Sequence, residues 1–237
     1  MVLANVSSVF YHGGVGNASL RRCQDMSQNP LSQWGRALDR DFFHQETEAL
    51  ARALLGTVLV HEAPEGVTAG RVVEVEMYRG VNDRAAHSYR GVPTERTHVM
   101  FGPPGYAYVY FIYGMHYCLN VVAAPDGVGE AILIRALEPV SGMELMAERR
   151  HMLWPMPPRL IRTLTNGPGK LAQALGVSKA QYGWPLWSPP LRFYVAESPL
   201  SKWAIREGPR INIGYAGEAA HYPWRFWIAG NPFVSRG

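Results

Sequence analysis

Hydrophobic and polar residues alternate with the two-residue period of β-strands along most of the chain. Runs rich in Val, Ile, Leu and Tyr are separated by turns that contain Gly or Pro, which is typical of strands joined by hairpins. The segment 113–116 predicts the tight turn of one such hairpin. Strands are predicted at 57–61, 70–78, 106–113, 117–124, 131–137, 191–197, 210–214 and 225–230.

Helical spacing of apolar residues occurs only in short stretches between these strands. The stretch 41–56 predicts a helix with its N-cap at the first residue and a glycine at its end. Ser141 and Glu144 form a capping box, which predicts a helix through residue 152. The segment 166–175 predicts a Gly-rich loop that leads into a short helix.

Many hairpin-linked strands and few helices favour the α+β class. The pattern predicts a curved, mainly antiparallel sheet, as in a roll or open barrel, with a few flanking helices and a protruding β-hairpin. Residues 1–38 are rich in Ser, Gly, Asn and Gln without a sustained period, and they predict a loosely ordered N-terminal extension. Residues 39–237 are predicted to form a single domain.

Composition adds a bias toward an intracellular, nucleic-acid-binding protein. The 12 Tyr and 7 Trp supply flat rings that build cores and also stack on bases. A net charge of +4 and an isoelectric point near 9.1 favour a polyanionic partner mildly. Two cysteines, Cys23 and Cys118, are too few for a disulfide scaffold or zinc cluster and favour a reducing compartment. No apolar run approaches the roughly 20 residues of a membrane-spanning helix, and residues 1–11 predict no signal peptide.

The strand at 70–78 carries the first candidate chemistry. Alternation places Glu74, Glu76 and Tyr78 on one face of this strand. Two carboxylates and a phenol on one face suit a general base beside an aromatic wall. The same pattern fits the solvated outer face of a two-layer sheet, and the pattern alone favours that simpler interpretation.

The predicted hairpin carries the second candidate. Tyr106, Tyr108 and Tyr110 share one strand face, which ordinary cross-strand packing explains well. Packing does not explain an apolar tip made of Tyr113 and Met115. Such a tip suits a wedge that is pushed between base pairs and partly unstacks DNA.

Three further polar positions stand out in apolar or Gly-rich surroundings. Asn120 is either a satisfied core amide or a group that reads the edge of a ligand. Arg135, within an apolar strand, is expected to face an anion such as Glu76. The turn before the helix at 166–175 exposes backbone amides beside Lys170, which suits either a phosphate contact or a plain capped helix. It lacks the spacing of a Walker motif.

Together, and in this order, these segments resemble the alkyladenine (3-methyladenine, methylpurine) DNA glycosylase family. The resemblance runs from about Phe42 to Ser235, with gaps at 153–163 and 178–206. Its most specific pieces are R-V-V-E-V-E-M-Y (71–78), A-A-H-S (85–88), Y-V-Y-F-I-Y-G-M (108–115), L-N (119–120), R-A-L-E-P (135–139), N-G-P-G-K-L (166–171) and A-G-E (216–218).

The resemblance implies a role for each matching residue at the reaction centre. Glu76 is implied to be the general base that activates the attacking water, and Arg135 to position that water and Glu76. The residues implied to surround the extruded base and the water are Tyr78, His87, Tyr110, Asn120 and Ile211. The three rings would sandwich the base, the amide of Asn120 would clash with the 2-amino group of guanine, and the main-chain carbonyl of Ile211 would help to hold the water.

The resemblance also implies contacts with the DNA duplex. Tyr113 would fill the gap left by the extruded base, supported by Met115. Thr94, Arg96 and Lys170 match positions that contact the DNA backbone. One departure lies beside the pocket, because Asn212 stands where the family often has a small residue. A shifted lesion preference is therefore expected.

The implied function is that of an intracellular, DNA-associated repair enzyme of the cytoplasm or nucleoid. It would flip alkylated, etheno- or deaminated purines out of double-stranded DNA and hydrolyse the N-glycosidic bond, leaving an abasic site. The resemblance implies no metal or cofactor. We expect a monomer and no membrane partner. The absence of a lysine near Glu76 in sequence favours water as nucleophile. The alternatives are a non-catalytic damaged-DNA-binding module, a hydrolase of free nucleosides, and a purely structural strand-rich domain.

Overall fold

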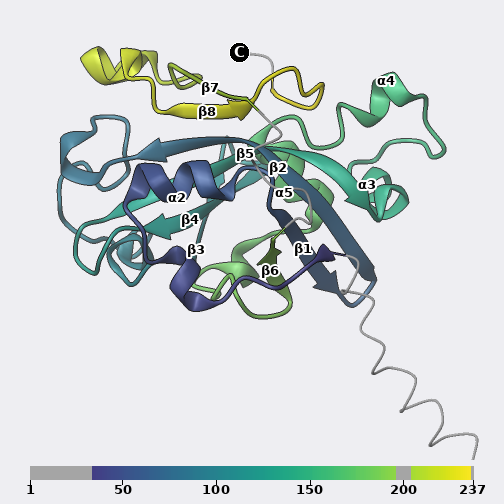
Figure 1. The fold of residues 1–237 in the computed structure, drawn as a ribbon, viewed down its shortest axis with the longest axis horizontal. Helices are drawn as coiled ribbons and strands as arrows, with labels where there is room; N and C mark the ends of the chain where they lie inside the picture. The colour runs from purple at the N-terminus through teal and green to yellow at the C-terminus, as the bar shows by residue number, and fades with distance from the viewer. Residues whose placement is uncertain (1–33, 196–203, 236–237) are drawn as a thin grey trace, which may run out of the picture. The chain divides into compact units, whose positions relative to one another are not determined.

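The computed structural model describes residues 34–195 and 204–235, and most strands within them lie where the alternating pattern predicts them (Figure 1). The strands are β1 (Val58–Ala63), β2 (Gly66–Tyr78), β3 (Ala107–Ile112), β4 (His116–Ala123), β5 (Glu130–Ser141), β6 (Leu191–Tyr194), β7 (Ile205–Gly208) and β8 (Arg225–Ile228). The last two positions of the strand predicted at 191–197 lie outside the described residues.

The long strand β2 organises the sheet. Its first half pairs with β1, in a register that places Val58 opposite Arg71. Its second half pairs with β8 on the same side, where Glu76 lies opposite Arg225. On the other side β2 pairs with β5 along most of its length. All pairings are antiparallel, and the main strand order is β3-β4-β5-β2-β1-β6. The predicted α+β fold with a curved, mainly antiparallel sheet is confirmed.

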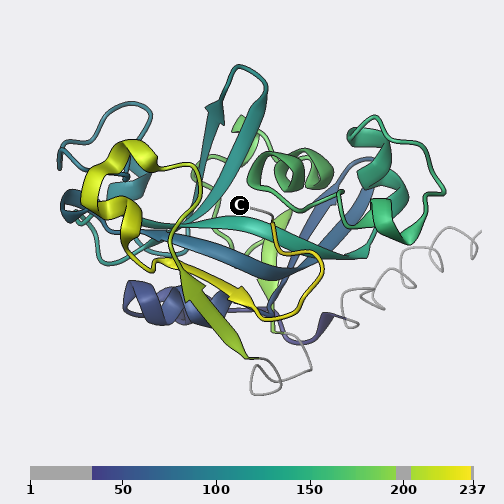
Figure 2. The same ribbon diagram turned by 90° about the horizontal axis from the view of Figure 1, so that it is seen from above.

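Short helices flank the sheet. They are α2 (Thr47–Leu54), α3 (Met143–Arg149), α4 (Pro158–Ile161) and α5 (Pro168–Leu175), with 3-10 turns η3 (Arg40–Phe43), η4 (Gly80–Asn82), η5 (His98–Phe101), η6 (Lys179–Gln181) and η8 (Gly214–His221). Helix α2 covers one face of the sheet and α5 the other (Figure 2). Buried leucines on both helices join the main hydrophobic core. None of the helices in the described ranges is long and apolar enough to cross a membrane.

Two predicted helix starts are wrong. The N-cap of α2 is Glu46 and not Asp41, because the Glu46 carboxylate accepts the backbone N–H groups of Glu48 and Ala49. The predicted capping box before α3 is absent, since Ser141 still belongs to β5 and Gly142 is the N-cap. Gly142 has a φ of 71°, and a Cβ there would lie 2.3 Å from the Val67 carbonyl oxygen, so the turn requires glycine.

The strand predicted at 210–214 is also wrong. Arg210 is buried there in an ion pair with Asp83, and Asn212 has a φ of 61°, which no strand residue adopts. The stretch is instead a loop, and its residues 211–213 line the pocket. The neighbouring segment β7 provides the strand that pairs with β8.

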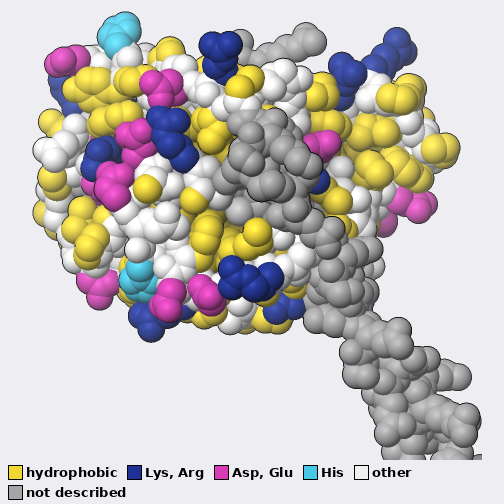
Figure 3. Space-filling view, viewed as in Figure 1, with side chains coloured by type: hydrophobic (Ala, Val, Ile, Leu, Met, Phe, Trp, Pro, Cys, Tyr) yellow, Lys and Arg dark blue, Asp and Glu magenta, His cyan; other side chains and the backbone are white. Residues whose placement is uncertain are grey.

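The β3–β4 hairpin and residues 34–38 lie at opposite edges of the sheet. The β3–β4 hairpin projects well beyond the rest of the sheet (Figure 2). The predicted extension at 1–38 falls largely outside the described residues, although Trp34 and Leu38 are buried and the Leu38 N–H donates to the Phe193 carbonyl. On the face that carries α2, basic, acidic and apolar side chains are interspersed (Figure 3).

Candidate active site

A pocket of about 400 Å³ opens between β2, the β3–β4 hairpin, the start of α5 and the loop at 211–215. The predicted site residues that line it are Glu76, Tyr78, His87, Tyr110, Tyr113, Asn120, Arg135, Lys170 and Ile211. Thr94, Arg96 and Met115 lie outside its lining. Residues from strands far apart in the chain therefore meet around one cavity.

Glu76 lies in this pocket with a side chain that is 0% exposed. Its Oε1 accepts the backbone N–H of Ile211 at 2.8 Å, and its Oε2 accepts the Tyr78 hydroxyl at 3.0 Å. Glu74 on the same strand face is equally buried. The solvated outer face that the pattern alone favoured is therefore wrong. Arg225 of β8 and Ser235 bond the Glu74 carboxylate, and Ile211 and Tyr78 bond the Glu76 carboxylate.

Arg135 on β5 has the anionic partners that a guanidinium in apolar surroundings requires. Its Nη1 lies 3.5 Å from Glu76 Oε1, and its Nε lies 3.3 Å from Glu74 Oε1. Burial raises the pKa of Glu76, while Arg135, the Ile211 N–H and the Tyr78 hydroxyl act in the opposite direction. The Glu76 carboxyl group therefore has a raised proton affinity although it stays next to the Arg135 cation.

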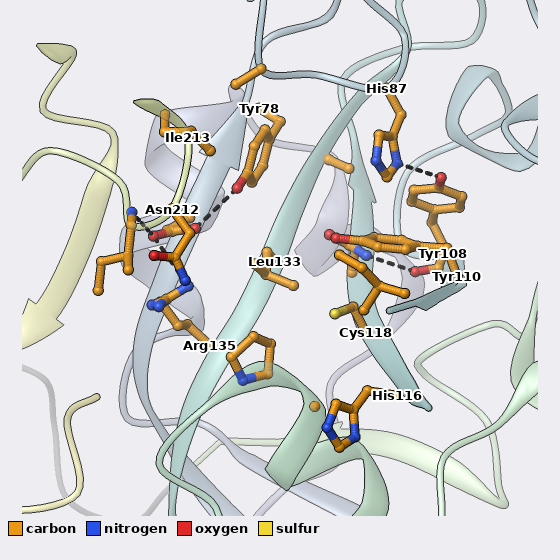
Figure 4. A pocket seen from close by; sticks show the side chains of 18 of the residues that line it. Tyr78, His87, Tyr108, Tyr110, His116, Cys118, Leu133, Arg135, Asn212 and Ile213 are labelled. Carbon is orange, nitrogen blue, oxygen red and sulfur yellow. Dashed lines mark hydrogen bonds and ion pairs between the residues drawn. The ribbon is translucent and has the colours of Figure 1, made fainter. Parts of the chain in front are cut away.

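Aromatic rings face each other across the cavity, with Tyr78 on one side and His87, Tyr108 and Tyr110 on the other (Figure 4). The His87 and Tyr110 ring centroids are 4.6 Å apart, with the rings at 75°. His87 Nδ1 shares a hydrogen bond of 2.8 Å with the Tyr108 hydroxyl. Burial lowers the pKa of His87 to about 4, so the imidazole is neutral at neutral pH. The pocket between these rings is therefore a flat slot, and its aromatic walls carry no charge at neutral pH.

Tyr78 is held from behind by a buried ion pair to which the sequence pattern assigned no role. The Arg210 guanidinium lies 4.6 Å from the Tyr78 ring centre and pairs with Asp83 through both of its terminal nitrogens. Burial raises the pKa of Tyr78 well above its usual value, so the hydroxyl remains a hydrogen-bond donor to Glu76. The sequence signal that could have indicated this pair is an arginine within an apolar stretch, which needs an anionic partner, as for Arg135.

The remaining lining groups are an amide and a thiol. Asn120 is buried and its Nδ2 donates to the Tyr108 carbonyl at 2.9 Å, so the amide is anchored and also borders the cavity. Cys118 lines the same wall, and burial raises the pKa of its thiol. A thiol that stays protonated adds a soft, uncharged surface to the slot.

The hairpin tip is exposed beside the pocket mouth. Tyr113 is 76% exposed and Met115 is 69% exposed. Tyr113 and Gly114 both have positive φ angles, of 54° and 67°, and the Met115 N–H donates to the Ile112 carbonyl. This is the backbone pattern of a type I′ turn, which presents its two central residues to solvent.

The predicted backbone-contact residues occupy different places. Lys170 lies in the first turn of α5, with its Nζ 3.0 Å from Asn166 Oδ1. The Arg96 guanidinium lies 5.1 Å from the Tyr110 ring centre, on the outside of the aromatic wall. Thr94 shares a hydrogen bond with Thr97. Only Lys170 among these three reaches the cavity.

The arrangement suits chemistry by proton transfer and electrostatic stabilisation on a flat aromatic ligand. A buried carboxylate with a raised pKa can accept a proton from water, and a neighbouring guanidinium can orient both. In the part of the chain that the structure describes, no group of three His, Cys, Asp or Glu residues could hold a metal ion.

Comparison with known proteins agrees with this geometry. Residues 41–232 match the family described as "Methylpurine-DNA glycosylase (MPG)". A protein of Bacillus cereus named "Putative 3-methyladenine DNA glycosylase" is 48% identical over 198 residues, which cover 82% of this chain and 97% of that protein. A protein of the same name from Bacillus thuringiensis (strain Al Hakam) is similar to the same extent. The chain belongs to the methylpurine-DNA glycosylase family, a family of DNA glycosylases.

Proposed function

We propose that this DNA glycosylase extrudes alkylated purines from double-stranded DNA and hydrolyses the bond between base and sugar, with Glu76 as the base that activates water. The observation that carries the proposal is the wholly buried Glu76 carboxylate, paired with Arg135, in a slot walled by aromatic rings. The names of the relatives from Bacillus, which specify 3-methyladenine, support an alkylated purine as substrate.

The walls of the slot favour a cationic, flat base. Methylation of a purine at a ring nitrogen gives it a positive charge, and such a ring is attracted to the electron-rich faces of Tyr78 and Tyr110. His87 is neutral at neutral pH, so it does not repel a cationic base. Asn120, fixed by the Tyr108 carbonyl, would reject a purine with an extra amino group.

The proposed step is a displacement at the anomeric carbon of the sugar. The bond between that carbon and the purine breaks, and its electron pair leaves with the purine, which neutralises a methylated base. A water molecule forms the new carbon–oxygen bond and gives one proton to Glu76. The carboxylate also stabilises the positive charge that develops on the sugar, while Arg135 holds the carboxylate in place.

In the proposed function, extrusion of the base leaves a gap in the duplex, and the exposed Tyr113 would fill it. A wedge of Tyr113 and Met115 offsets part of the stacking energy that is lost, which is a few kcal/mol per step. Lys170, at the start of α5 beside the cavity, would contact a phosphate.

Lys170 is also the group that makes the monofunctional assignment testable. Burial lowers its pKa, and a free amine in the pocket could attack the sugar. Its hydrogen bond to Asn166 favours a binding role instead. Borohydride trapping with a damaged duplex is expected to give no covalent complex and no strand cleavage. A trapped complex that Lys170→Ala abolishes would contradict the water mechanism.

The decisive experiment compares the wild type with Glu76→Gln on duplex oligonucleotides that carry 3-methyladenine, ethenoadenine or hypoxanthine. Loss of the base is expected to slow release by about 100- to 10,000-fold, with binding of the damaged duplex retained. Glu138→Gln on β5 is the matched control, because that carboxylate pairs with Arg71 away from the cavity and is expected to leave release unchanged.

The other outcomes separate the competing functions. A wild type that binds the damaged duplex but releases nothing is a damaged-DNA-binding module. Release from free nucleosides, with little sensitivity to salt, identifies a nucleoside hydrolase. Release by Glu76→Gln at the wild-type rate removes Glu76 as the base.

A further inference from the structure

A second buried carboxylate lies beside the proposed base. The Glu74 side chain is 0% exposed, and its Oε1 accepts the Nε–H of Arg225 at 2.6 Å and lies 3.3 Å from Arg135 Nε. Two carboxylates, Glu74 and Glu76, and two guanidinium groups, Arg135 and Arg225, thus share one buried cluster. A charge buried at this depth requires such complete pairing.

Ser235 connects the two halves of this cluster. Its hydroxyl accepts the Nε–H of Arg135 at 3.0 Å and donates to Glu74 Oε1, also at 3.0 Å. Its backbone N–H donates to Glu74 Oε2 at 2.7 Å. One hydroxyl group therefore links Arg135 to Glu74 in a directed chain of hydrogen bonds.

We propose that Glu74 and Ser235 are positioning residues, which hold Arg135 in the orientation that presents its Nη1 to Glu76. The proposal rests on the proposed function, in which Glu76 activates water. Neither Glu74 nor Ser235 lines the cavity, so both act through Arg135.

The geometry of the guanidinium explains why its Nε end matters. An arginine side chain has four flexible torsions, and its planar head points to one place only when several of its nitrogens are held. Here Ser235 and Glu74 hold the Nε side, and the opposite nitrogen Nη1 lies 3.5 Å from Glu76. Without the Ser235 hydroxyl, Arg135 can turn toward Glu74 alone, and without Glu74 its Nε side loses its anion; in either case Nη1 is no longer held toward Glu76.

A purely structural role predicts a different result. A buried hydroxyl that only contributes to stability can be lost with a lower free energy of unfolding and an unchanged rate at temperatures where the protein is folded. A positioning hydroxyl changes the rate of the chemical step while the protein stays folded. Single-turnover rates measured well below the melting temperature separate the two roles.

The first test uses Ser235→Ala and Ser235→Thr with a duplex that carries 3-methyladenine or ethenoadenine. Ser235→Ala keeps the backbone N–H to Glu74 but loses the bridge to Arg135, and about a tenfold to hundredfold slower single-turnover release is expected, with unchanged duplex binding. Ser235→Thr restores the hydroxyl and is expected to restore the rate. Thr57→Val is the matched control, since that buried hydroxyl bonds only the Leu54 carbonyl.

The second test is the pH profile of Glu74→Gln. The charge of Glu74 contributes to the raised pKa of Glu76, so its removal lowers that pKa. The acidic limb of the profile is expected to move to lower pH while the plateau rate falls, a combination that simple destabilisation does not produce. The ionisable groups that face Glu76 are Arg135 on β5, Glu74 and Tyr78 on β2, Cys118 on β4 and Tyr215 on η8.

The outcomes distinguish this inference from the function on which it rests. A wild type that releases no base, or Glu76→Gln that releases it normally, overturns the proposed function. An active wild type and inactive Glu76→Gln, together with Ser235→Ala no slower than Thr57→Val, overturn the positioning role alone. If Glu74→Gln does not fold, the Ser235 pair decides the question by itself.

Discussion

Glu76 combines two demands that oppose each other, because the proposed reaction requires an ionised carboxylate and burial disfavours the ionised form. Burial raises its pKa above the ordinary value, which the unfolded chain retains. The folded state therefore binds a proton more tightly than the unfolded state does. As pH rises through this interval, the unfolded chain releases its proton first, and the free energy of unfolding falls.

Because burial of the Glu76 charge costs free energy, we predict that Glu76→Gln stabilises the protein at neutral pH. The amide keeps the shape of the side chain and removes the cost of burying a charge, while Arg135 keeps Glu74 as its partner. An increase of about 1 kcal/mol, or about 2–4 °C in Tm, is expected near pH 8. Near pH 4, below the ordinary carboxyl pKa, the difference is expected to vanish.

Thermal unfolding of both proteins from pH 4 to pH 8 measures this effect. Glu138→Gln, whose carboxylate is partly exposed, is expected to show no such growth with pH. A Glu76→Gln protein that is less stable than the wild type at pH 8 would mean that its hydrogen bonds outweigh the burial of its charge.

The sequence predicts the individual groups of the site better than it predicts their environment. The pairing of Arg135 with Glu76 follows from charge alone, since a buried guanidinium needs an anion. The burial of Glu74 does not follow from its strand pattern. It depends on Ser235, which lies 161 residues later in the chain. Local alternation carries no information about a cover supplied from such a distance.

At the scale of elements, the tip of the β3–β4 hairpin has a residue that is unfavourable for the turn itself. A type I′ turn favours Asn or Gly at its first central position, because positive φ is unfavourable for other residues. This turn has Tyr113 there, with a φ of 54° and a side chain that is largely exposed. Neither burial nor backbone preference explains the tyrosine, whereas the proposed wedge would.

We therefore predict that Tyr113→Asn raises the free energy of unfolding by about 1 kcal/mol and lowers base release. The substitution relieves the backbone and removes the ring that fills the gap in the duplex. Tyr113→Phe is the matched control and is expected to leave both properties near those of the wild type. Denaturant unfolding and single-turnover base release measure the two effects, and an Asn variant with full activity contradicts the wedge.

The strand prediction fails where long-range contacts replace local ones. The alternating strands and the 113–116 turn are found close to their predicted positions. The stretch 210–214 is apolar at strand spacing but folds as a loop. There the pairing of Arg210 with Asp83, 127 residues earlier, and the left-handed Asn212 fix the backbone. No local period encodes that pairing.

At the scale of the whole molecule, a net charge of +4 is modest for a protein that acts on a polyanion. The face that carries α2 has both signs of charge interspersed (Figure 3). A low net charge gives little long-range attraction, so affinity for the duplex is expected to depend on individual cations that contact phosphates.

Lys170 is predicted to be one of these cations. Binding of a damaged duplex is expected to weaken as salt rises, and Lys170→Ala is expected to reduce the slope of log affinity against log salt by about 1. Lys179→Ala, an exposed lysine outside the pocket lining, is the control. Equal slopes for all three proteins would place Lys170 away from the phosphates.

The bridge made by Ser235 also has a consequence for biosynthesis. Ser235 bonds Arg135 from 100 residues further along the chain, so the ribosome completes the hairpin wedge and the strand walls well before it adds the residue that orients the guanidinium. On the proposed roles, the residues that contact the duplex are therefore synthesised before the residue that orients Arg135.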